Sequence, residues 1–173
     1  LAKAVGGFQG RELSFGAAGF VAVEIPFLPQ LGGDLEVGTV LLAKGKDPRD
    51  LTIEPEDGAH AIYGAVGIEA RPFVTSDPTQ INGLTGIWAS GHSGATTTGG
   101  LFRAVVDLHA GYDFPIQQGK YWLGPTVGFV HVFQSDSELR PEDANILALG
   151  IHGMFDSAPR IPPDRDGDKI IDR

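Results

Sequence analysis

The residues best suited to chemistry in this sequence are isolated charged side chains that alternate with apolar ones. Arg103, Asp107 and His109 are spaced so that an extended strand places them on one face. They could form a gate or a proton-sensitive site, or a ladder of ion pairs that fills an interior. We favour the ladder, because buried charges of both signs have to be paired. The expected charge network comprises Glu24, Glu36, Glu69, Arg71, Arg103, Asp107 and His109.

A second candidate site lies near the end of the chain, where carboxylates recur at every second position. Asp164, Asp166 and Asp168 are followed four residues later by Asp172. Hard oxygen ligands at this spacing suit a loop that wraps around Ca²⁺. The alternative is a solvated acidic linker without a metal. Calcium at these aspartates is the one cofactor that the sequence suggests.

Nothing in the sequence indicates a catalytic centre. His92 and Ser93 are adjacent, and adjacent residues of an extended segment point to opposite sides. We expect both in a polar Gly/Thr-rich loop over residues 91–99, with His92 exposed to solvent. No nucleophile elbow and no fixed spacing of base and nucleophile is visible in the sequence. The sequence therefore predicts that the protein is not an enzyme.

The elements that must position the charged residues are strands. Glycines recur inside every apolar segment, where each would cost a helix about 1 kcal/mol relative to alanine. Alternation with a period of two fits these segments much better, and it is clearest in residues 102–114. The other strands that we expect are 13–25, 34–43, 61–71, 121–133 and 144–155, with two weaker ones at 2–9 and 82–90.

The face opposite the apolar stripe decides which kind of sheet these strands build. It carries Gly, Ala, Ser and Thr with isolated charges, as the narrow interior of an eight-stranded barrel requires. We therefore expect an all-β fold, an eight-stranded antiparallel transmembrane β-barrel of outer-membrane type with a short Asp-rich tail. A soluble barrel or sandwich is the alternative. Aromatic girdles at the membrane interfaces are expected from Trp88, Tyr112, Phe114, Tyr121, Trp122 and Phe155.

The amino-acid composition excludes several classes of partner and of site. The 22 acidic residues outnumber the 13 lysines and arginines, and the net charge of −9 argues against a nucleic-acid partner. The absence of cysteine excludes disulfides and thiol nucleophiles. No run of about 20 mostly apolar residues is present for a spanning helix. The acidic stretches 44–59 and 134–143 suit contacts with lipopolysaccharide through divalent cations, and equally suit ordinary loop solubility.

Three passages resemble the OmpA-like outer-membrane protein family. Residues 123–133 and 139–150 are similar to the penultimate and last strands of such barrels. Residues 162–172 look like the start of the thrombospondin type 3-like calcium linker that follows them, although Lys169 stands where that linker normally has glycine. The resemblance implies a barrel over residues 1–156 and a periplasmic linker over 157–173. It places the protein in the outer membrane of a Gram-negative bacterium, with both termini in the periplasm.

The function that this resemblance implies is anchoring. The barrel would hold the outer membrane while a downstream domain, missing from this chain, binds peptidoglycan. A small pore or a subunit of an envelope transport complex is the alternative, and a lipid-modifying barrel enzyme is the least favoured. The expected partners are outer-membrane lipid and lipopolysaccharide, peptidoglycan, and other envelope proteins.

Overall fold

Antiparallel strands make up the regular structure of the protein. The computed structural model describes residues 2–9, 12–43, 58–74, 82–98, 100–117, 120–134 and 143–155. The Asp-rich tail and its predicted calcium ligands Asp164, Asp166, Asp168 and Asp172 lie outside these ranges. Within them, no helix is long and apolar enough to cross a membrane. The strands are β1 (Ala2–Gln9), β2 (Glu12–Leu28), β3 (Leu31–Ala43), β4 (Gly58–Ala70), β5 (Ile87–Thr98), β6 (Leu101–Tyr112), β7 (Phe114–Ile116), β8 (Tyr121–Val132) and β9 (Ala144–Phe155).

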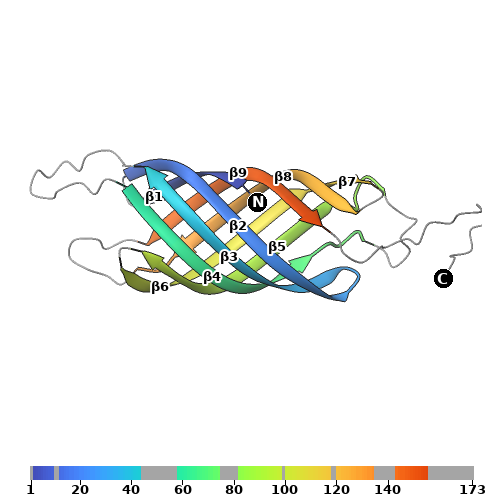
Figure 1. Ribbon diagram of the computed structural model, residues 1–173, viewed down its shortest axis with the longest axis horizontal. Helices are drawn as coiled ribbons and strands as arrows, with labels where there is room; N and C mark the ends of the chain where they lie inside the picture. The colour runs from blue at the N-terminus through green and yellow to red at the C-terminus, as the bar shows by residue number, and fades with distance from the viewer. Residues whose placement is uncertain are drawn as a thin grey trace, which may run out of the picture.

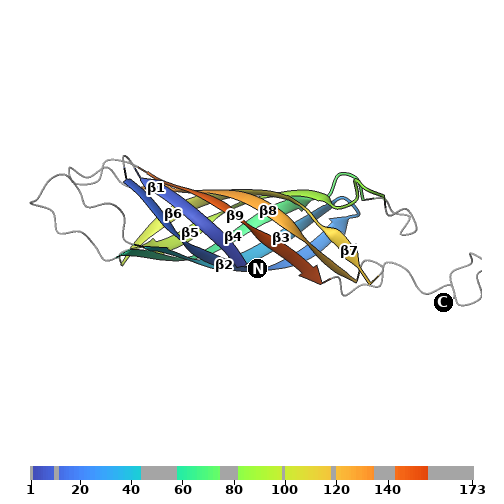
Figure 2. The ribbon, with the colours of Figure 1, turned by 90° about the horizontal axis from the view of Figure 1, so that it is seen from above.

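All these strands belong to one curled sheet. Their order is β6-β5-β4-β3-β2-β1-β9-β8-β7, and every pairing is antiparallel. β6 stands first in this order and also pairs with β8, from Val105 opposite Val132 to Gly111 opposite Thr126. Figures 1 and 2 show the strands running obliquely around a common long axis. The all-β antiparallel architecture that the sequence predicts is confirmed.

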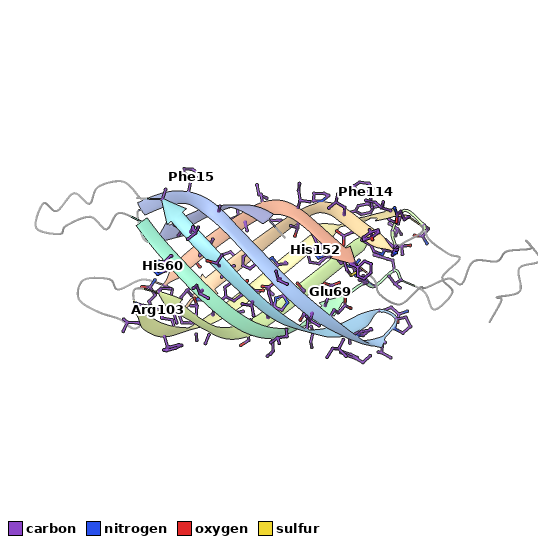
Figure 3. All side chains as sticks on the ribbon, viewed as in Figure 1. Phe15, His60, Glu69, Arg103, Phe114 and His152 are labelled. Atoms are coloured by element: carbon purple, nitrogen blue, oxygen red, sulfur yellow. The ribbon has the colours of Figure 1, made fainter. Side chains whose placement is uncertain are left out.

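Most of the large apolar side chains point away from the interior of the curl. Along β8, exposed and buried positions alternate almost without interruption, so that Leu123 and Val127 are exposed while Trp122 and Thr126 are buried. This is the facing predicted for residues 121–133, and β6 and β9 show the same alternation. In Figure 3 the labelled Phe15 and Phe114 project outward near opposite ends of the sheet, whereas Glu69 and His152 lie within it.

Glycine makes room for the few large side chains that point inward. Phe20 of β2 lies opposite Gly38 of β3, and Gly38 lies opposite Tyr63 of β4. The two aromatic rings pack over Gly38 with their centroids 5.3 Å apart, and both residues are almost fully buried. A Cβ on Gly38 would lie 2.2 Å from Cδ1 of Phe20, so the rings occupy the space that a larger residue would need. The high glycine content thus has a packing cause.

The sequence prediction is wrong for β5. We expected a strand over 82–90 and a loop over 91–99, but β5 runs from Ile87 to Thr98 and pairs on both sides. Its exposed positions are Ala89, Ser93 and Ala95, so no apolar stripe marks the strand. Gly and Ala also have low strand propensity, which pairing with β4 and β6 overrides. His92 is consequently a buried strand residue instead of an exposed loop residue.

Substitution of Gly38 tests the packing of the inward rings. Gly38→Ala should lower the free energy of unfolding by about 1–3 kcal/mol, because the enclosed rings of Phe20 and Tyr63 cannot move aside freely. Gly64→Ala on β4 is the matched control, since its Cβ would meet nothing within 4 Å. Urea unfolding followed by tryptophan fluorescence measures both. Equal stability of the two variants would show that the interior is packed more loosely around Gly38 than the close approach of the Phe20 ring implies.

Candidate functional site

A cluster of histidines and carboxylates lies inside the curled sheet. In the register, Asp107 of β6 faces His92 of β5, His92 faces Gly67 of β4, and Gly67 faces Asp34 of β3. Gly67 is the position that lets this row come together, because a Cβ there would lie 2.2 Å from the ring of His92. His92 therefore reaches across β4 to Asp34 of β3, and it also contacts Asp107 of the adjacent β6. We call Asp34, Glu36, His92, Asp107 and His109 the central cluster.

The contacts of the central cluster converge on Asp107. His92 Nε2 lies 2.8 Å from Asp34 Oδ2, while its Nδ1 contacts Asp107 Oδ1. His109 Nε2 lies 3.1 Å from the same Asp107 oxygen. The hydroxyl of Tyr63 donates to Glu36 Oε1. Asp107 has no exposed surface and His92 is 4% exposed, so these groups interact out of contact with bulk water.

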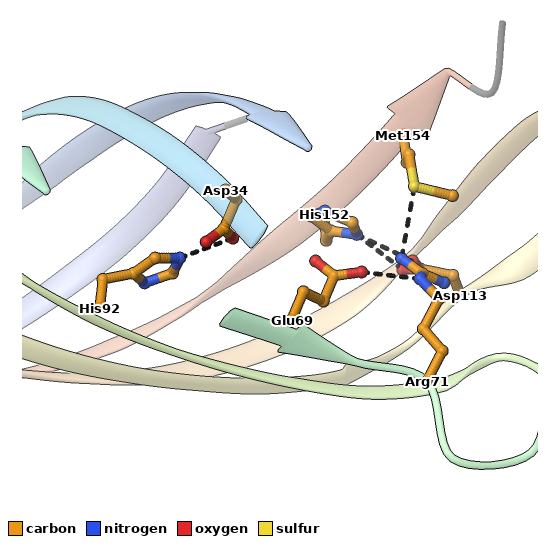
Figure 4. Close-up of polar contacts among 7 residues, drawn as sticks. All are labelled: Asp34, Glu69, Arg71, His92, Asp113, His152 and Met154. Atoms are coloured by element: carbon orange, nitrogen blue, oxygen red, sulfur yellow. Dashed lines mark hydrogen bonds and ion pairs between the residues drawn. The ribbon is translucent and has the colours of Figure 1, made fainter. Parts of the chain in front are cut away.

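A second cluster, built around Arg71, occupies the interior nearer the start of β7. Arg71 Nε lies 2.7 Å from Glu69 Oε1, and its Nη2 lies 3.2 Å from Asp113 Oδ2. The other neighbour of Asp113 is His152 Nδ1, at 2.8 Å, and Met154 Sδ lies 3.5 Å from Arg71 Nη2. Figure 4 shows this Arg71 cluster apart from the His92–Asp34 pair. It joins β4, the β6–β7 junction and β9 across the interior.

The predicted charge network divides between these two clusters. Glu36, Asp107 and His109 belong to the central cluster, whereas Glu69 and Arg71 belong to the Arg71 cluster. The other two predicted members are Glu24 and Arg103. Glu24 is half-buried on β2 opposite Asp34 in the register. Arg103 is half-buried on β6, and among the described residues it forms no ion pair with either cluster.

Sequence reasoning missed several members of the clusters. His92 carried no usable signal, because its strand was expected to be a loop. Asp34, Asp113 and His152 alternate with apolar neighbours on the inward side of their segments, so periodicity places them on the correct face. Their pairing partners depend on the register between strands, which periodicity within one strand does not contain.

The aromatic residues predicted to form girdles do not all point outward. Phe114, Tyr121 and Phe155 are exposed, and the rings of Tyr121 and Phe155 lie 5.3 Å apart. Trp88 and Trp122 instead point inward and are each 3% exposed. The guanidinium of Arg71 lies 5.9 Å from the Trp122 ring centre, and the Trp88 and His152 rings pack at a tilt with their centroids 4.3 Å apart. Both tryptophans therefore enclose the Arg71 cluster.

Protein-family models, curated proteins and solved structures give no match to this chain.

Removal of the Arg71 guanidinium should be strongly destabilising. Arg71→Met leaves Glu69 and Asp113 buried without their cation, and loss of one partner of a buried ion pair costs about 3–5 kcal/mol. Asp113→Asn added to this variant should restore part of the loss, because it removes one buried negative charge. Urea unfolding measures the free energy of unfolding of the wild type and of both variants.

Lys120→Met serves as the control for Arg71→Met. Lys120 is exposed and lies over the ring of Tyr121, so its replacement should change stability little. A loss for Lys120→Met as large as that for Arg71→Met would contradict the structural role of the Arg71 cluster.

Proposed function

We propose that the chain is an outer-membrane protein whose β-sheet forms an eight-stranded transmembrane barrel. The observation that carries the proposal is the distribution of polarity. Large apolar side chains of β2, β3, β4, β6, β8 and β9 are exposed, while Glu36, Glu69, Arg71 and Asp107 are buried. Proteins in water rarely expose an apolar surface of that extent. Lipid removes the cost, because apolar side chains then face a hydrocarbon solvent.

The strand pairings support a closed barrel. β7 follows β6 after a single intervening residue, Asp113, and both pair with β8, so they act as one interrupted strand. Counted in this way, eight strands remain and each has partners on two sides, including β1 with β9 and β6 with β8. Closure matters in a bilayer, because an open sheet edge would leave backbone groups without hydrogen bonds in hydrocarbon.

The filled interior favours an anchor over a pore. Phe20, Tyr63 and Val105 are buried inside the curl, and both charge clusters cross it. Eight strands leave only enough room for side chains, so water would pass only if these groups rearranged. Together with the OmpA-like resemblance, this supports a barrel that fixes the protein in the outer membrane, with both termini in the periplasm. A pore or transport subunit remains the competing function, and we propose no enzymatic activity.

An arginine on the outer surface tests the lipid-facing orientation. Leu108 lies near the middle of the β6–β7 run, and Leu108→Arg should cost about 2–4 kcal/mol in phospholipid vesicles. Phe102 lies near the start of the same run and also points outward, so Phe102→Arg should cost only about 0–1 kcal/mol. Urea unfolding in vesicles measures both, and heat-modifiable migration in detergent reports the folded barrel. A protein that stays folded and soluble without detergent, and tolerates both arginines equally, would refute the membrane location.

Two further measurements distinguish anchoring from pore formation. We expect the protein, as the cell produces it, to sediment with peptidoglycan, and we expect this property to be lost when the chain is cut after residue 156. In planar bilayers the barrel should conduct poorly, because its interior is filled. High conductance that falls with Asp107→Asn, without peptidoglycan binding, would favour the pore instead.

A further inference from the structure

The central cluster brings together the ligand types of a transition-metal site. Glu36, His92, Asp107 and His109 each offer one ligand atom, and these atoms all lie within 4.8 Å of one another. All four residues are buried. They come from β3, β5 and β6, so no single segment of the sequence carries the set.

The charge balance of the cluster favours a cation. Three carboxylates lie in it, those of Asp34, Glu36 and Asp107. Among the described residues, none of the three forms an ion pair with a lysine or an arginine. Their cationic neighbours are two imidazoles, which even when both are protonated carry one charge fewer than the three carboxylates. Buried charge that is not compensated is costly, and a divalent ion at this point would remove the excess.

Two carboxylate oxygens of the central cluster are buried without a hydrogen-bond partner in the described part of the chain, which is a second, independent observation. Asp107 has no exposed surface, and its Oδ2 has no hydrogen-bond partner in the described part of the chain. The other oxygen, Oδ1, already contacts both imidazoles. Asp34 Oδ1 is likewise buried and without a partner there. Buried carboxylate oxygens usually have a hydrogen-bond partner, so these two, beside two histidines, are available to bind a further group.

The distances suit a small ion with four ligands. Bonds of about 2.0–2.2 Å from nitrogen and carboxylate oxygen to Zn²⁺ place tetrahedral ligands roughly 3.4 Å from one another. His109 Nε2 and Asp107 Oδ1 are already 3.1 Å apart. Small side-chain rotations would bring the rest of the set from its present spacing to this value.

We propose that Glu36, His92, Asp107 and His109 bind a divalent transition-metal ion, with Zn²⁺ as the best fit to their chemistry. Two imidazoles with two carboxylates suit Zn²⁺, whereas Ca²⁺ and Mg²⁺ prefer oxygen ligands alone. The surroundings fit as well: Asp34 accepts from His92 Nε2, leaving Nδ1 for the metal, and Tyr63 donates to Glu36. Four protein ligands close the coordination sphere, so the ion is structural and ties β3, β5 and β6 together.

Zinc content of the refolded protein tests this site. Tag-free protein is unfolded in urea with a chelator and then refolded in the presence of Zn²⁺. After excess metal has been removed, the zinc content is measured by inductively coupled plasma mass spectrometry. We expect about one zinc per chain in the wild type and at least about tenfold less in His92→Gln. His109→Gln provides a second variant if His92→Gln does not fold. His152→Gln, which alters the Arg71 cluster instead, should keep its zinc.

This zinc measurement tests the metal site independently of the proposed membrane location, because it requires only that the wild-type protein is folded. Folded wild type without bound zinc would overturn the metal site and leave the barrel untouched. Loss of zinc from His152→Gln as large as from His92→Gln would place the metal elsewhere and also overturn it. Co²⁺ gives a separate readout, since tetrahedral nitrogen and oxygen ligands produce an intense visible spectrum and a hydrated octahedral ion does not.

Discussion

The contact between the Arg71 guanidinium and the carboxylates of Glu69 and Asp113 holds together parts of the chain that lie far apart in sequence. Glu69 lies near the end of β4 and Arg71 directly follows that strand, while Asp113 lies between β6 and β7 and His152 lies on β9. Buried ion pairs add little net stability compared with apolar packing, but they penalise any arrangement that leaves one charge alone. Such a cluster therefore selects one register among strands whose small residues would otherwise allow several.

The large inward side chains fit because glycines lie beside them on neighbouring strands. A narrow curled sheet has room for a ring or an imidazole only where a neighbouring strand offers no side chain. Gly38 gives this room to Phe20 and Tyr63, and Gly67 gives it to His92. A glycine on the neighbouring strand thus allows apolar packing around Gly38 and polar contacts around Gly67. It explains why a chain with so many glycines still forms an ordered interior.

The outer surface of the sheet is largely apolar, whereas its interior holds charged and polar side chains. Exposed leucine, valine, isoleucine and phenylalanine follow each other along successive strands, and buried charges stand behind them. A hydrocarbon surrounding makes both halves of this pattern favourable, because it stabilises the apolar surface and forces polar groups to find partners inside. The proposed anchoring role and the proposed metal ion depend on this arrangement in the same way: both require an interior that is occupied rather than open.

The sequence by itself determined the strands with a clear apolar stripe and, among the described residues of those strands, the face on which the charged side chains lie. Period-two alternation in residues 102–114 and 121–133 is enough to place Asp107 and Thr126 inside, because neighbouring side chains of a strand point to opposite sides. It failed for β5, whose outward positions are Ala and Ser and whose existence depends on pairing with β4 and β6. Only the tertiary structure decided that His92 joins Asp34 to Asp107 and that Arg71 reaches Asp113. Those contacts are set by the register between strands, a long-range property that alternation within a single strand does not encode.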